Sequence, residues 1–163
     1  MSLLSFCQWL QETDVSIAIR EGALYYPIIG GIHLLSIALF GGMILATDLR
    51  LLGWGLRRYP VSDVVGQLRS WKWLGFVVVT VSGLLLTWAE PLKLYRSRSF
   101  WTKMALLVVV GVHALVYHRD VYGKAAMLDK MTDIPGKAKR AAALSLILWA
   151  AIVLAGRLIA FDQ

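Results

Sequence analysis

The chain has 163 residues, of which 58% are hydrophobic and 17% charged, and its formal net charge is +7. This composition is too apolar for an ordinary soluble domain. The basic residues lie between apolar runs instead of on one soluble face, which argues against a nucleic-acid-binding protein. A lone cysteine, Cys7, excludes an internal disulfide and a metal site built from several thiolates. We therefore expect a single membrane domain over residues 1–163, in contact with the lipid bilayer.

Residues 1–20 predict an amphipathic helix. Leu3, Phe6 and Leu10 fall at helical spacing, with polar side chains on the opposite face. Such a helix lies in the membrane interface, with Trp9 at the depth of the lipid headgroups. The alternative is a helix that packs over the end of the membrane bundle.

Four apolar stretches follow, and they predict membrane spans at about residues 22–47, 71–89, 100–118 and 141–160. The first has no Asp, Glu, Lys or Arg over a length that crosses a bilayer, which takes about 20 residues as a helix. The third and fourth are shorter, but Lys103 and Arg157 near their ends can extend them by reaching to the interface. Because the connections are short, we expect an all-α, up-down four-helix bundle.

The basic residues predict the orientation of the spans. Lys and Arg are concentrated in two connections: the one between the first and second spans, and the one between the third and fourth. The other side of the membrane has fewer of them. Basic connections stay in the cytoplasm. We therefore expect a multi-pass protein of the bacterial inner (plasma) membrane with both termini outside.

The histidines are the first candidates for chemistry, because an ionisable side chain inside a membrane is a functional hypothesis by default. His33 lies in the first span, and His113 and His118 lie in the third. These two spans run parallel, and a rise of 1.5 Å per residue places His33 about 13–16 Å and His113 about 18 Å below the outer surface. Two imidazoles from facing helices can hold a haem iron from both sides. The pattern predicts one haem b between the first and third spans, with His118 as the substitute ligand.

Glycines and basic residues near His33 fit the same hypothesis. Gly31 and Gly42 are eleven residues apart and share a helix face, which lets a flat cofactor or another backbone approach closely. Lys103 or Arg157, near the outer end of the bundle, can pair with the haem propionates.

Two other interpretations of His33 stay open. The imidazole can instead hydrogen-bond a hydroxyl on a neighbouring helix, with Thr80, Ser82, Thr87 and Ser145 as candidates. The chain would then be a cofactor-free structural or assembly subunit of a larger membrane complex. Alternatively, His33, Met43 and Met104 are suitable copper ligands, although no Met-x-x-Met or His-x-His cluster is present.

The remaining charged groups and motifs suggest no enzyme. Asp48 and Arg50 point to different sides of a helix, so they predict a solvated helix end, or separate bridges to other helices. The chain has no nucleophile motif, zinc-protease motif or phosphate-binding glycine loop. An electron-transfer or accessory subunit is therefore favoured over a stand-alone enzyme.

Three segments carry more specific motifs: IHLLSIALFGGMILATDLRLLG, SFWTKMALLVVVGVHALVYHRDVY and ALSLILWAAIVLAGRLIAF. They resemble an uncharacterised family of small bacterial four-helix inner-membrane proteins. This resemblance implies a four-span bundle and no activity, and it matches His33, Asp48, Arg50, Lys103, His118 and Arg157.

More distantly, the chain is similar to copper-resistance D-type membrane proteins and to small b-type cytochromes, which share four-helix bundles with intramembrane histidines. Two-haem cytochromes need four ligating histidines, and this chain has three. At most one bis-histidine haem therefore fits. The leading hypothesis is a b-type cytochrome that exchanges electrons with a quinone or a redox partner protein, alone, as a homo-oligomer or within a larger complex.

Overall fold

The computed structural model describes residues 2–120, 122–131 and 133–162, without the side chains of residues 118–120 and 122. The described residues form helices joined by short connections, and no strand occurs among them. The predicted all-α fold class is confirmed.

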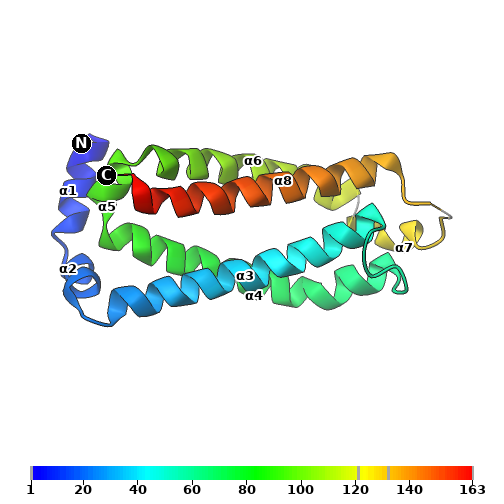
Figure 1. The fold of residues 1–163 in the computed structure, drawn as a ribbon, viewed down its shortest axis with the longest axis horizontal. Coiled ribbons are helices and arrows are strands. Elements are labelled where there is room, and N and C mark those ends of the chain that lie inside the picture. Colours follow the sequence, from blue (N-terminus) through cyan, green and yellow to red (C-terminus); the bar gives the residue numbers. More distant parts are fainter. Residues whose placement is uncertain (1, 121, 132, 163) are drawn as a thin grey trace.

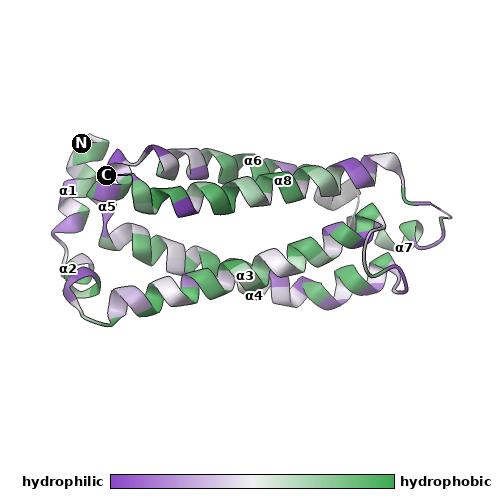
Figure 2. Ribbon diagram, in the orientation of Figure 1, coloured by the Kyte–Doolittle hydropathy of each residue, from purple (hydrophilic) through white to green (hydrophobic). Residues whose placement is uncertain are grey.

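Four long helices make up the body of the protein (Figure 1): α3 (Tyr25–Leu52), α4 (Val61–Ala89), α6 (Arg98–Asp120) and α8 (Gly136–Leu158). They alternate in direction, and each is long and apolar enough to cross a membrane. Figure 2 shows hydrophobic residues along all four, with most hydrophilic residues near the two ends of the bundle. Large apolar side chains such as Leu34 and Leu115 are exposed on the outside, which indicates contact with lipid. The predicted four-helix membrane bundle is thus supported.

The long helices do not all contact one another equally. α3 packs along α4 and α8, while α6 packs along α8. Within the described residues, α6 makes at most isolated close approaches to α3 and α4. The first and third spans are therefore linked through α8 and do not share a packed interface.

The connection between α3 and α4 depends on specific local contacts. α3 ends at Gly53, whose φ of 74° is a left-handed conformation that favours glycine, and whose N–H bonds the carbonyls of Leu49 and Arg50. α4 begins at Val61, whereas the predicted second span begins at about residue 71, because the helix extends outside the apolar segment on its N-terminal side. Pro60, at its N-cap, has no side-chain hydrogen-bond acceptor. The Asp129 carboxylate, at the end of α7 (Ala125–Leu128), accepts the first N–H groups of α4 instead.

The N-terminal region forms two short helices where one was predicted, α1 (Leu3–Gln11) and α2 (Asp14–Glu21). The chain breaks between them because the Thr13 hydroxyl accepts the N–H of Ser16 and starts a new helix. α1 packs against α5 (Pro91–Arg96), and α2 packs against α4 and α3, so both lie across one end of the bundle (Figure 1). The fully buried Ser16 hydroxyl donates to the Ala89 carbonyl at 3.2 Å. α2 therefore packs over the bundle end, whereas α1 has no buried residue and exposes Phe6 and Trp9, as the predicted interfacial helix would.

The remaining short elements are η1 (Tyr122–Lys124), before α7, and η2 (Ile159–Phe161), which extends α8. The chain ends beside α1 and α5, so both termini lie at the same end of the bundle (Figure 1).

One close helix contact generates a prediction about stability. A Cβ at Gly41 of α3 would overlap the indole of Trp149 on α8, whereas a Cβ at Gly42 would meet no atom within 4 Å. We expect Gly41→Ala to destabilise the protein by about 1–3 kcal/mol, because overpacking forces the helices apart. Gly42→Ala is the matched control and should leave stability nearly unchanged. Thermal unfolding in detergent measures both, and equal stability of the two variants would contradict the α3–α8 packing.

The Asp129 cap generates a prediction about pH. Burial raises the pKa of Asp129, but hydrogen bonds from the Ser62 hydroxyl and from the N–H groups of Val61 and Ser62 outweigh it and hold the pKa below 3.8. A depressed pKa stabilises the fold above the unfolded-state pKa, and this stabilisation disappears as the pH falls. Asp129→Asn keeps the acceptor oxygen but removes the charge at the helix N-terminus, so it should cost about 0.5 kcal/mol at neutral pH, and the difference from wild type should shrink below about pH 4. Unfolding curves across this pH range test it, and a difference that does not depend on pH would contradict it.

Candidate functional site

His33 is anchored to the neighbouring helix α4. Its Nδ1 lies 2.9 Å from the Ser82 hydroxyl, and that hydroxyl lies 2.6 Å from the Val78 carbonyl. Ser82 is 4% exposed, and its single hydroxyl hydrogen is donated to Val78. With its hydrogen directed at Val78, the Ser82 hydroxyl can accept a hydrogen bond from His33, and the tautomer compatible with this arrangement carries the ring proton on Nδ1. The Nε2 atom is then left with a free lone pair, the form of imidazole that binds metals.

The surroundings of His33 include a basic group from the third span. Gly83 lies against the ring, and a Cβ there would be 3.0 Å from Cε1. The Lys103 ammonium of α6 acts electrostatically on His33, and its side chain lies against Gly156 of α8. No hydrogen bond or ion pair joins Lys103 to another described residue. We call His33, Ser82 and Lys103, with the two flanking glycines, the His33 site; all four spans contribute to it.

The structure does not bring His113 to this site. His113 is ten residues after Lys103 on α6, which is about 15 Å further along the helix axis. Its ring instead lies beside Tyr117, with 4.6 Å between the ring centroids. The depth predicted from sequence assumed that the two spans begin at the same level. Lys103 of α6 acts electrostatically on His33, which favours an offset between the two spans.

The other predicted site residues lie elsewhere. His118 belongs to α6, but its side chain lies outside the described residues. Arg157 is exposed, and its guanidinium carbon is 5.6 Å from the centre of the Phe161 ring. Met43 packs near Gly75 of α4, and Met104 is half-buried on α6. Within the described part of the chain, no three His, Cys, Asp or Glu side chains gather as a metal site.

The glycine face predicted to admit a flat cofactor is open. Gly31 and Gly42 are exposed, and a Cβ on either would meet no atom within 4 Å. The glycines that permit close contacts inside the bundle are Gly41, against Trp149, and Gly83, against His33. Spacing alone identified a shared face but not the direction in which that face points.

A second polar cluster lies near the opposite end of the bundle and corrects the prediction for Asp48. Asp48 is 1% exposed, so it is not part of a solvated helix end. Ser145 of α8 and Lys72 of α4 both interact with its carboxylate, whose Oδ2 atom is buried without a hydrogen-bond partner. The Lys72 ammonium donates to the Thr47 hydroxyl, which itself bonds the Met43 carbonyl. We call Thr47, Asp48, Lys72 and Ser145 the Asp48 cluster.

The Asp48 cluster has a signal in the sequence that becomes clear once the helix pairing is known. An acidic residue ends the first apolar stretch and a basic residue begins the second, and antiparallel helices bring such positions to one level. From sequence alone, however, Lys72 is assigned to the connection before the second span, because it lies between Trp71 and Trp73 and tryptophan is typical of the membrane interface. Arg50, the other predicted bridge, donates to the Tyr59 carbonyl at 2.7 Å within the α3–α4 connection.

The fold and these sites define a small four-span membrane protein with ionisable groups between its helices. The chain belongs to DUF6644, a family of unknown function, whose model matches residues 6–162. The predicted membership of an uncharacterised family is confirmed, and the match assigns no activity. No curated protein and no solved structure matches the chain significantly.

The Asp48 cluster generates a prediction about coupling between helices. Removing one partner of a buried charge pair leaves the other uncompensated, which typically costs about 3–5 kcal/mol. We expect Asp48→Asn and Lys72→Met each to destabilise the protein strongly, and the double variant to lose less than the sum of the two. Thermal unfolding in detergent measures the cycle, with Asp63→Asn, an exposed carboxylate on α4, as control. Additive losses would show that Asp48 and Lys72 act independently.

Proposed function

We propose that the protein is a membrane electron-transfer protein that binds one b-type haem through His33. The observation that carries the proposal is the hydrogen bond between Nδ1 of His33 and the Ser82 hydroxyl. Histidines that bind metals commonly donate their other ring N–H to an oxygen acceptor, which fixes the tautomer and orients the ring. Bound haem supplies reversible one-electron chemistry at iron, and a neutral imidazole is its usual axial ligand.

Lys103 supports the same proposal. An ammonium group without a partner is costly between apolar helices, and Lys103 has no ion pair among the described residues. A carboxylate beside His33, such as a haem propionate, would neutralise it through a charge-assisted hydrogen bond. The role of the chain is to hold this group and to exclude water from it. His113 lies too far along α6 to coordinate from the other side in this arrangement, so the proposal rests on His33.

A cofactor-free structural or assembly subunit is the second candidate, and one observation favours it. The hydrogen bond to Ser82 satisfies a polar atom of His33 without any ligand and joins α3 to α4. His33 would then serve the packing of the first two spans. Copper binding is less favoured, since Met43 lies ten residues from His33 on the same helix, about 15 Å along its axis.

The cellular setting is also part of the proposal. Even without Lys72, which belongs to the Asp48 cluster, the α3–α4 and α6–α8 connections are rich in Lys and Arg. The positive-inside rule supports a bacterial inner membrane location with these connections in the cytoplasm and both termini outside. A quinone or a redox partner protein would exchange electrons with the haem.

The absorption spectrum of the protein, expressed with haem supplied and purified in detergent, tests the proposal. We expect a Soret band in the oxidised protein and a shifted Soret band after reduction. His33→Ala should abolish these bands, because it removes the iron ligand. His113→Ala is the matched control and should retain them.

Two results would contradict this function. A wild-type spectrum with only tryptophan and tyrosine absorption would remove the haem and favour the cofactor-free subunit. Retention of all bands in a folded His33→Ala variant would show that the haem is held elsewhere. Ser82→Ala should keep the haem but shift its reduction potential, because it removes the hydrogen bond that polarises the ligand.

A further inference from the structure

A pocket lies at the end of the bundle where the two termini meet. Its volume is about 420 Å³, and its lining comes from α1, α2, α5, the end of α4 and the C-terminal residues. The lining includes three basic side chains, Arg20, Lys93 and Arg96, and two acidic ones, Glu90 and Asp162. It lies outside the His33 site and the Asp48 cluster, and neither site explains its charges.

The two acidic side chains of the pocket are already engaged by other groups. Glu90 accepts a hydrogen bond from the Tyr26 hydroxyl at 2.9 Å and pairs with Lys93 at 3.1 Å. Asp162 accepts hydrogen bonds from the Ser97 hydroxyl and the Ser99 N–H, both at 2.7 Å. Neither carboxylate forms an ion pair with Arg20 or Arg96 within the described residues.

The two arginines therefore retain unused donors. The Nη1 group of Arg20 is buried and has no hydrogen-bond partner. The one ion contact of Arg20 among the described residues is a distant 3.7 Å approach of Nη2 to Glu21, whose side chain is 68% exposed. A buried N–H without a partner is destabilising, and such groups are rare in folded proteins. An anion in the pocket would satisfy it.

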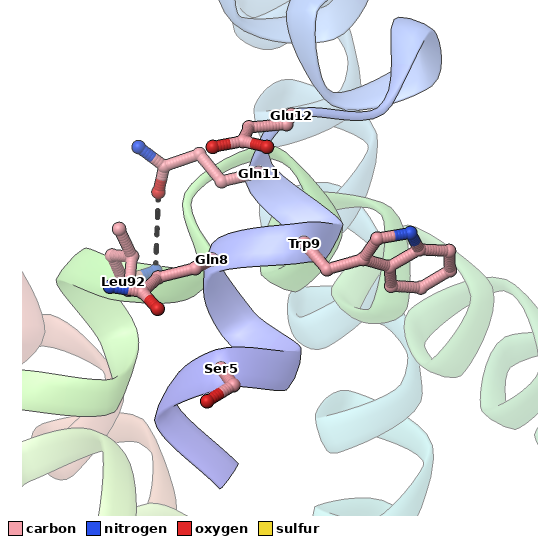
Figure 3. Close-up of a pocket in the computed structure, with 6 residues that line it drawn as sticks. All are labelled: Ser5, Gln8, Trp9, Gln11, Glu12 and Leu92. Carbon is pink, nitrogen blue, oxygen red and sulfur yellow. Dashed lines mark hydrogen bonds between the residues drawn. The ribbon is translucent and has the colours of Figure 1, made fainter. Parts of the chain in front are cut away.

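An amide at the edge of the pocket points to the same ligand class. Gln11 and Leu92 line this pocket and also a neighbouring one, which Figure 3 shows. There the Gln11 side chain reaches from α1 to α5, and its oxygen accepts the N–H of Leu92 at 3.4 Å. With the oxygen used in this way, the amide NH₂ remains as a further donor in the lining that Gln11 shares with Arg20. The pocket thus combines guanidinium and amide donors, the set that binds phosphate oxygens.

We propose that this pocket binds the phosphate of an anionic phospholipid headgroup. The pocket lies where the spanning helices end, at the level of lipid headgroups. The adjacent α1 exposes Phe6 and Trp9, and such aromatic side chains are typical of the membrane interface. A headgroup held by Arg20 and Arg96 would leave its acyl chains along the apolar outer surface of the bundle.

Lipid retention by the full-length protein tests this proposal. Detergent-purified protein is mixed with phosphatidylglycerol or phosphatidylcholine, and native mass spectrometry measures the bound lipid. We expect preferential retention of phosphatidylglycerol, reduced about tenfold by Arg20→Gln, because a charge-assisted hydrogen bond is lost. Arg96→Gln should reduce it less. Arg58→Gln, an exposed arginine at the opposite end of the bundle, is the matched control and should bind normally.

Further arms distinguish a lipid site from a soluble-anion site and from general charge attraction. If inorganic phosphate at millimolar concentration displaces the lipid completely, the site takes soluble anions and the lipid proposal is overturned. An equal loss in Arg20→Gln and Arg58→Gln would indicate general charge attraction and would also overturn it. If Arg20→Gln does not fold, Arg20→Lys keeps the charge but loses the planar guanidinium, and it should still bind phosphatidylglycerol more weakly than wild type.

Discussion

The buried carboxylate of Asp48 is the constraint on which the helix arrangement depends. It is 1% exposed on a helix that otherwise presents apolar side chains to lipid, and a charge in that position is costly unless it is paired. Its partners come from two other helices, Lys72 on α4 and Ser145 on α8. These partners fix the rotation of α3 and its register with both neighbours. The close contact of Gly41 with Trp149, two helical turns before Asp48, is compatible with that register.

The His33 site lies near the other end of the same helices. His33 and Asp48 are fifteen residues apart, about 22 Å along α3. The segment between them is occupied by aromatic packing, in which Phe40 contacts both Phe76 and Trp149. The two polar sites are therefore separated by an apolar layer. The Asp48 cluster holds three helices together, whereas the His33 site retains an imidazole lone pair and a lysine without an ion pair, which gives it the chemical capacity to bind a ligand.

Several features of this arrangement follow from local sequence alone. The length of the apolar stretches predicts four spans, because crossing a bilayer sets a minimum helix length that depends on no other part of the chain. The isolation of His33 within the first stretch identified it as a residue that needs a partner. The same reasoning placed Ser82 among the possible hydroxyl partners, but it could not choose between Ser82 and a second histidine.

That choice was decided by the tertiary structure, because a helix pattern determines which residues share a face and not which neighbour that face meets. Lys103 of α6 acts electrostatically on His33, whereas His113 lies ten residues further along the same helix and packs beside Tyr117. An error of a few residues in a predicted helix end moves a side chain by several ångströms in depth, enough to separate two ligands. Burial of Asp48 likewise depends on partners 24 and 97 residues away in the chain, Lys72 and Ser145. The sequence by itself therefore determined the spans and the residues that require partners, and helix packing determined which partners they have.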